Sequence, residues 1–140
     1  MSTMSRKTKK ILVTGAAGQI GSELTLSLRA KYGNDNVIAS DLNPNVSGTL
    51  RESGPFETVD VTSREILDET VRKYGIDTIY HLAAILSAVG EKKPDLAWNV
   101  NMNGIRNILE TALEQKILRV FIPSSIAAFG PETPKEETPQ

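Results

Sequence analysis

Three glycines spaced along one turn constrain this chain more than any other feature. The apolar run Ile11–Val13 leads into Gly15, Gly18 and Gly21, and a helical repeat of apolar residues then continues to Gly33. The first glycine permits a tight turn, the second lets the backbone approach a pyrophosphate, and the third lets the helix pack closely on the strand. The free N–H groups at the start of that helix would face the phosphates. The pattern predicts a dinucleotide-binding turn.

A second apolar run, Val37–Ser40, ends at Asp41, twenty residues after Gly21. An acidic side chain at this place accepts hydrogen bonds from the ribose hydroxyls of adenosine. It also repels the additional phosphate of NADP, and the nine residues that follow Asp41 include no arginine or lysine. We therefore predict NAD as the cofactor, with Asp41 beside its ribose. The alternative, in which Asp41 only forms a turn at the strand end, remains open.

Composition narrows the function classes. The 140 residues suffice for one domain, and a net charge of −1 provides no broad positive surface for nucleic acid or an anionic membrane. The absence of cysteine excludes disulfides and agrees with a reducing compartment. The single histidine, His81, argues against a zinc site built by the protein alone. No apolar run approaches the length of a membrane span. We expect no metal, no nucleic acid and no membrane among the partners.

Strand and helix signals alternate along the chain. The predicted strands cover residues 11–13, 37–40, 56–61, 77–82 and 119–122. The predicted helices run from Gly21 to Gly33, from a capping box at Thr62–Glu65 to Gly75, and from Pro94 to about Gln115, whereas residues 42–55 are expected to form a surface loop. This alternation predicts the α/β class, as a Rossmann-type doubly wound parallel sheet of strand order 3-2-1-4-5.

Ligands of such sheets bind beyond the carboxyl ends of the strands, where the strand order reverses. Four loops are expected to meet there: Gly15–Gly21, Asp60-Val61, Leu82–Gly90 and Ser124-Ser125. We expect residues 1–9 to form a basic leader and residues 10–130 the nucleotide-binding domain. Residues 131–140 are expected to form an extended or disordered tail that leads to a missing C-terminal portion.

The motifs taken together resemble the extended short-chain dehydrogenase/reductase superfamily, also called the NAD-dependent epimerase/dehydratase superfamily. The resemblance rests on residues 14–21, Asp60-Val61, residues 81–84 and residues 123–125, and it covers nearly the whole chain. More narrowly, residues 18–24, 81–88 and 122–131 resemble the short-chain type of L-threonine 3-dehydrogenase. That family oxidises the C3 hydroxyl of L-threonine to 2-amino-3-ketobutyrate by hydride transfer to NAD. The chain matches the N-terminal half of the fold, which is therefore incomplete here.

The resemblance also implies roles for individual residues. The implied cofactor-binding residues are Gly15, Gly18, Gln19, Ile20, Gly21, Asp41, Leu42, Asp60, Val61, Leu82, Ala83, Ala84 and Asn101. Ser125 matches the catalytic hydroxyl, and Ser87 and Ser124 match substrate-binding positions. The superfamily pairs a tyrosine base with a lysine four residues later, but Tyr32, Tyr74 and Tyr80 are followed at that spacing by Asn36, Thr78 and Ala84. We expect this chain alone to be inactive.

Several alternatives remain open. Asp60 can contact the cofactor or merely help begin the next helix, and Asn101, on an apolar helical face, can support the site or act in the chemistry. His81 is interpreted as a packed strand-end residue rather than a catalyst. Two alternative functions remain for the whole chain: part of a nucleotide-sugar epimerase or dehydratase, or a truncated dinucleotide-binding paralogue that is not an enzyme. The resemblance implies L-threonine as the small-molecule partner and a homodimer for the full-length form. It also implies a cytoplasmic location, or a mitochondrial one if the source is eukaryotic.

Overall fold

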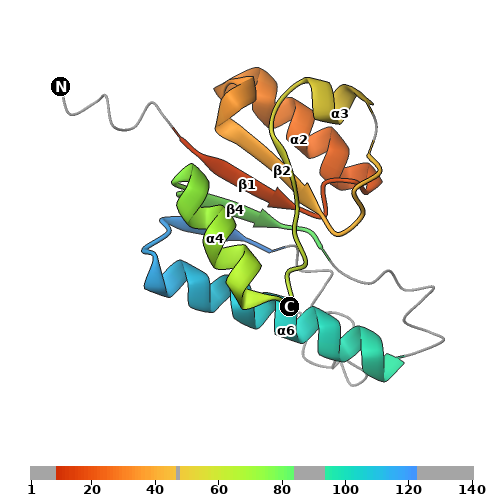
Figure 1. Cartoon of the computed structure of the whole chain (residues 1–140), viewed down its shortest axis with the longest axis vertical. Helices are drawn as coiled ribbons and strands as arrows, with labels where there is room; N and C mark the ends of the chain where they lie inside the picture. The colour runs from red at the N-terminus through yellow and green to blue at the C-terminus, as the bar shows by residue number, and fades with distance from the viewer. Residues whose placement is uncertain (1–8, 47, 84–93, 123–140) are drawn as a thin grey trace, which may run out of the picture.

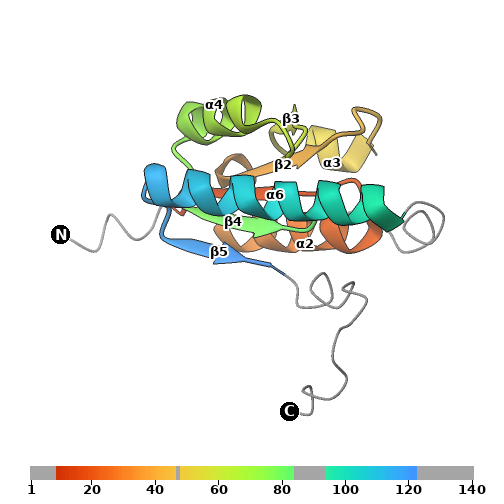
Figure 2. The same cartoon turned by 90° about the horizontal axis from the view of Figure 1, so that it is seen from below.

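Five parallel strands form one sheet, with helices on both of its faces (Figures 1 and 2). The computed structural model describes residues 9–46, 48–83 and 94–122. The strands are β1 (Ile11–Thr14), β2 (Val37–Asp41), β3 (Phe56–Thr58), β4 (Thr78–His81) and β5 (Arg119–Phe121). The helices are α2 (Gln19–Tyr32), the 3-10 turn η1 (Asn34–Asn36), α3 (Gly48–Glu52), α4 (Arg64–Tyr74) and α6 (Pro94–Glu114). The order β3-β2-β1-β4-β5 confirms the predicted topology.

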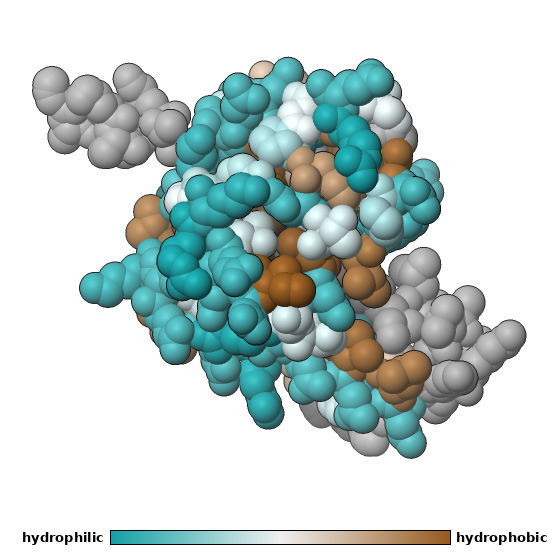
Figure 3. All heavy atoms as spheres, viewed as in Figure 1, coloured by the Kyte–Doolittle hydropathy of each residue, from teal (hydrophilic) through white to brown (hydrophobic). Residues whose placement is uncertain are grey.

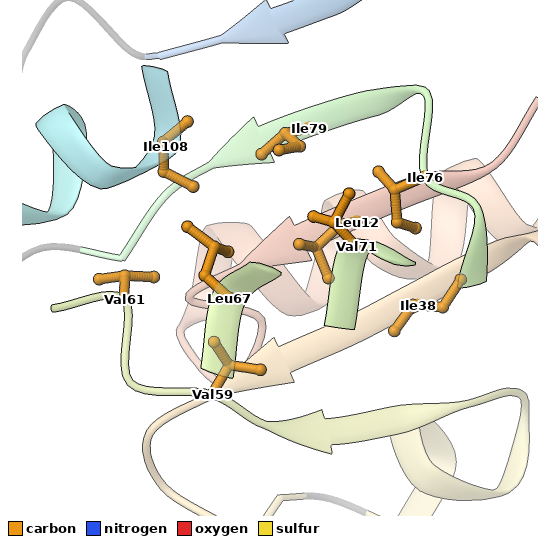
Figure 4. Close-up of a cluster of buried hydrophobic side chains, with 9 residues drawn as sticks. All are labelled: Leu12, Ile38, Val59, Val61, Leu67, Val71, Ile76, Ile79 and Ile108. Carbon is orange, nitrogen blue, oxygen red and sulfur yellow. The ribbon is translucent and has the colours of Figure 1, made fainter. Parts of the chain in front are cut away.

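The central strands are apolar on both faces because each face carries its own layer of helices. Leu12 pairs in register with Ile38 and Ile79, and these three side chains face α4 and α6 (Figure 4). Their cluster consists of the buried residues Leu12, Ile38, Val59, Val61, Leu67, Val71, Ile76, Ile79 and Ile108. The alternate residues of β1 and β2 pack on the opposite face with α2 and α3, in a cluster of Ile11, Val13, Ala16, Leu28, Val37, Ala39 and Leu50.

Three local predictions are wrong. Residues 48–52 were expected to be loop, yet they form α3, whose Leu50 is 1% exposed and packs in the second cluster. Strand β3 ends at Thr58 rather than at residue 61. The helix α4 is capped by Ser63, whose Oγ accepts the N–H of Ile66 at 3.4 Å, rather than by Thr62. Thr62 is engaged elsewhere, because its hydroxyl donates to Asp60 at 2.7 Å.

Helix α6 is apolar on more than the side that packs on the sheet. Its exposed apolar residues are Leu96, Trp98, Met102, Leu109 and Leu113. Figure 3, in the same view as Figure 1, shows hydrophobic surface over the N-terminal end of this helix. Within the described residues, no helix is both long and apolar enough to cross a membrane.

A buried arginine joins α2 to the β2–β3 side of the sheet. Arg29 is 2% exposed, and burial lowers the pKa of its guanidinium. That group donates to the carbonyls of Val37 (3.1 Å), Leu50 (2.7 Å) and Pro55 (2.6 Å) and to the hydroxyl of Ser53 (2.9 Å). These hydrogen-bond partners are all uncharged groups, and Arg29 links α2 through them to β2, to α3 and to the segment that follows α3.

The carboxyl ends of β1 and β4 are joined by one hydroxyl. Thr14 Oγ1 accepts the backbone N–H groups of Leu82 (3.0 Å) and Ala83 (3.1 Å). It lies 2.8 Å from Nδ1 of His81, so its own proton is left to donate to that nitrogen. The imidazole is 0% exposed, and its Nε2 has no hydrogen-bond partner among the described residues. Burial lowers the pKa of His81 to about 4, which keeps the ring neutral at pH 7.

We expect Arg29→Met to lower the free energy of unfolding by about 3 kcal/mol, because it removes a buried guanidinium that donates four hydrogen bonds. Arg51→Met is the matched control, since exposed Arg51 makes one hydrogen bond, to the carbonyl of Pro44 at 2.6 Å. The control should lose less than about 1 kcal/mol. Urea unfolding of both variants measures the difference. Equal losses in the two variants would contradict the assigned role of Arg29.

His81 gives a defined pH dependence. The folded state holds the imidazole neutral down to about pH 4, whereas the unfolded chain takes up a proton below its ordinary pKa of 6.5. The stability that depends on neutral His81 is thus complete above pH 6.5 and is lost as the pH falls toward 4. From pH 7 to pH 5 this group should remove about 2 kcal/mol. Urea unfolding at pH 7 and pH 5 should show that loss in the parent and not in His81→Gln. The same dependence of the free energy of unfolding on pH in both proteins would refute the assignment.

Candidate functional site

A pocket opens at the carboxyl ends of β1, β2 and β4, beside the segment that follows β3. Its volume is about 250 Å³. It is lined by Gly15, Gly18, Asp41, Leu42, Val59, Asp60, Val61, Leu82, Ala83 and Val100. Three of the four loops that were expected to meet contribute to this lining. The fourth, Ser124-Ser125, lies outside the described residues.

The three glycines of the turn each satisfy a different steric demand. Gly15 has a φ of +73°, and a Cβ there would lie 2.7 Å from the backbone nitrogen of Ala83. A Cβ on Gly21 would lie 2.1 Å from the carbonyl oxygen of Gly15, so any side chain would push α2 away from the turn. Gly18 differs, because a Cβ there would meet nothing closer than 3.6 Å, and the residue lines the pocket. The bare backbone of Gly18 is therefore open to a ligand.

Asp41 ties the end of β2 to this turn. Its Oδ2 accepts the backbone N–H of Ala17 at 2.9 Å, and its Oδ1 accepts that of Asn43 at 2.9 Å. Each carboxylate oxygen can accept more than one hydrogen bond, so both retain acceptor capacity toward the pocket. The two backbone bonds fix the direction of the carboxylate before any ligand arrives.

The segment after β3 forms the far wall of the pocket. The N–H of Val59 donates to the carbonyl of Asp41 at 3.0 Å, which attaches this wall to β2. Asp60 then turns the chain, because its Oδ1 accepts the backbone N–H of Thr62 at 3.0 Å. Asp60 also lines the pocket, and its contact with the cofactor stays a prediction. The carbonyl of Val61 accepts the side-chain N–H of Asn107 at 2.9 Å.

The charge of the lining is negative. Asp41 and Asp60 are its ionisable residues, and no lysine, arginine or histidine is among the lining residues of the described chain. His81 lies behind the lining and is fully buried, so its ring does not reach the pocket. Within the described ranges, no group of three histidine, aspartate or glutamate side chains is placed to hold a metal ion.

Some predicted site residues lie away from the lining. Gln19 and Ile20 are exposed on the first turn of α2, and Gly21 packs against Gly15. Asn101 is 4% exposed, buried on α6 as its apolar helical face indicated. The residues Ala84, Ser87, Ser124 and Ser125 lie outside the described residues, so their roles stay predictions.

The sequence interpretation did not include Val59 and Val100 in the site. Val59 was assigned to the interior of a strand, and it reaches the pocket because β3 ends one residue earlier. Val100 belongs to the long helix α6. The sequence pattern within a helix does not give the distance of that helix from the sheet. Val100 adjoins the buried Asn101, but neighbouring residues of a helix do not share a face, so helical spacing gave no signal for Val100.

Comparison with solved structures supports the geometry. An L-threonine dehydrogenase from Clostridium difficile superposes with a TM-score of 0.81 at 56% identity, over 88% of this chain and 38% of that one. A GalE-like L-threonine dehydrogenase from Cupriavidus necator, in its holo form, gives 0.79 at 50% identity, over 88% and 39%. A UDP-glucose 4-epimerase from Thermus thermophilus, in complex with NAD, gives 0.68 at 28% identity, over 79% and 36%.

Sequence comparison gives the same grouping. A relative from Staphylococcus saprophyticus, named an uncharacterized epimerase/dehydratase, is 53% identical over 132 residues. The match covers 94% of this chain and 41% of the relative, so this chain spans about two fifths of that protein's length. The profile of the NAD dependent epimerase/dehydratase family matches residues 11–140. This chain belongs to the NAD dependent epimerase/dehydratase family.

Proposed function

We propose that this chain binds NAD and forms the nucleotide-binding part of an oxidoreductase that acts on L-threonine. The observation that carries the cofactor assignment is the Asp41 carboxylate, held at the end of β2 by the N–H of Ala17 and facing a pocket with no lining cation among the described residues. A carboxylate there suits the free ribose hydroxyls of NAD and disfavours the phosphate that NADP carries.

The residues of the pocket suit the successive parts of the dinucleotide. The diphosphate would face Gly18 and the start of α2, whose first turn holds no acidic residue. The adenosine ribose would lie at Asp41 on β2. Because β3 lies beside β2 on the side away from β1, the adenine would lie over the wall formed by Val59, Asp60 and Val61.

The substrate assignment rests on the solved relatives. The L-threonine dehydrogenases from Clostridium difficile and Cupriavidus necator are 56% and 50% identical to this chain, whereas the Thermus thermophilus UDP-glucose 4-epimerase is 28% identical. NAD supplies the hydride acceptor, and the reaction also needs a base for the C3 hydroxyl. His81 is no candidate for that base, because it is fully buried and bonded to Thr14. Ser125, Ser124 and Ser87 keep their proposed catalytic and substrate-binding roles.

The cofactor preference can be tested by fluorescence titration of the chain with NADH and NADPH. We expect NADH to bind at least about tenfold more tightly, since two like charges a few ångströms apart in a partly dry site cost more than about 1.4 kcal/mol. Asp41→Asn should reduce this preference. Asp60→Asn, which neutralises the other carboxylate of the pocket, is the matched control and should keep it. Equal affinities in the parent, or an unchanged preference in Asp41→Asn, would refute the assignment.

The substrate can be tested by following NADH absorbance with L-threonine and NAD. We expect the 140-residue chain to bind NAD without producing NADH, because none of its tyrosines has a lysine four residues later. Joining it to the residues that follow the matched region in the Clostridium difficile L-threonine dehydrogenase should create the activity. A chimera that instead bound UDP-glucose and ignored threonine would favour the epimerase reading. Activity in the bare chain would contradict the assignment of the catalytic groups.

A further inference from the structure

A seam of polar side chains on the C-terminal half of α6 and just after it holds the segment that runs from the end of β3 into α4. Its members are Asn107 and Thr111 on α6 and Gln115 directly after the helix, and the intervals of four residues place them on one side. Thr111 Oγ1 donates to the Asp68 carboxylate at 2.7 Å, and Gln115 Nε2 donates to the carbonyl of Asp68 at 3.2 Å. The seam fixes α4 against α6.

Asn107 is the member of this seam that contacts the pocket wall. Its side-chain N–H donates to the carbonyl of Val61 at 2.9 Å, and Val61 lines the pocket. One turn earlier, Gly104 lets α6 approach the same residue, since a Cβ there would lie 3.0 Å from Val61 Cγ2. Val61 is therefore held from behind by α6, through its side chain at Gly104 and through its carbonyl at Asn107.

The same short wall is fixed at its other end by the proposed ribose ligand. The N–H of Val59 donates to the carbonyl of Asp41 at 3.0 Å. Between these two attachments lies Asp60, whose side chain and carbonyl take up the N–H groups of Thr62 (3.0 Å) and Ser63 (2.8 Å) in a tight turn. Without the bond from Asn107, this turn would keep its attachment to β2 and lose the polar one to α6.

We propose that Asn107 is a positioning residue for nucleotide binding: by holding the Val61 carbonyl, it sets the pocket wall against which the adenosine half of the dinucleotide packs. This inference rests on the proposed binding of NAD. Asn107 touches the wall and not the pocket, because it is absent from the lining while Val61 is part of it. Its removal should therefore weaken recognition of adenosine and leave recognition of the nicotinamide half unchanged.

The experiment compares the parent chain with Asn107→Leu, which keeps the side-chain size and removes the donor. Asn103→Leu is the matched control, because Asn103 is exposed on the same helix one turn earlier. Affinities for NAD, for AMP and for nicotinamide mononucleotide are measured by titration calorimetry. We expect Asn107→Leu to bind AMP and NAD about fivefold more weakly, as the loss of one hydrogen bond predicts. The affinity of Asn107→Leu for nicotinamide mononucleotide should equal that of the parent. Asn103→Leu should equal the parent in its affinity for all three ligands.

Amide hydrogen exchange, measured without any nucleotide, tests the positioning itself. The N–H groups of Thr62 and Ser63 should exchange faster in Asn107→Leu than in the parent or in Asn103→Leu. Unchanged exchange, unchanged AMP affinity, or equal weakening of both half-nucleotides in Asn107→Leu would overturn the proposal. A parent chain that bound neither NAD nor AMP would overturn the proposed function and the inference with it. If the parent binds NAD and AMP and Asn107→Leu binds them with the same affinities, the inference alone is overturned.

Discussion

The hydroxyl of Thr14 is the interaction on which the pocket depends. The backbone ladder between β1 and β4 ends with the bond from the N–H of Leu82 to the carbonyl of Thr14 at 3.1 Å, and the chains that leave these strands must nevertheless lie together beyond it. Thr14 Oγ1 meets this need by accepting two N–H groups from the β4 side, those of Leu82 and Ala83. Gly15 follows directly and has no side chain to keep the two loops apart. The glycine turn and the β4 loop therefore form one surface.

The buried polar groups follow a common principle. Arg29 and His81 are both inside the protein, and each forms hydrogen bonds with uncharged groups: Arg29 with three carbonyls and a hydroxyl, His81 with the hydroxyl of Thr14. A buried polar group is costly unless it is hydrogen-bonded, so such residues tolerate few alternative arrangements. Arg29 thereby specifies how α2, α3 and β2 meet on one side of the sheet. Thr14 and His81 specify how β1 and β4 meet at the centre.

The sequence predicted what depends on local pattern and on the rules of parallel sheets. The apolar runs gave the strands, and the right-handed crossover rule gave their order. Helix α3 was missed because its stability comes from Leu50 in the core and from Arg29, which lies 21 residues away along the chain. The contact of Asn107 with Val61 spans 46 residues and depends on how α6 is rotated against the sheet. No local periodicity carries that information, whereas the positions of Gly15, Gly18 and Asp41 in the pocket follow from motif spacing alone.

The chain has one histidine, His81, and its side chain is fully buried behind the lining of the pocket. In a nuclear magnetic resonance spectrum, the imidazole signals therefore all come from a single histidine ring. They can be assigned without mutants, because no second histidine overlaps with them. The ring contacts Thr14 on one side and lies close to the backbone of Gly104 on the other, so it senses both the strand ends and α6. His81 is thus a native spectroscopic probe at the junction of the sheet and the helix that backs the pocket wall.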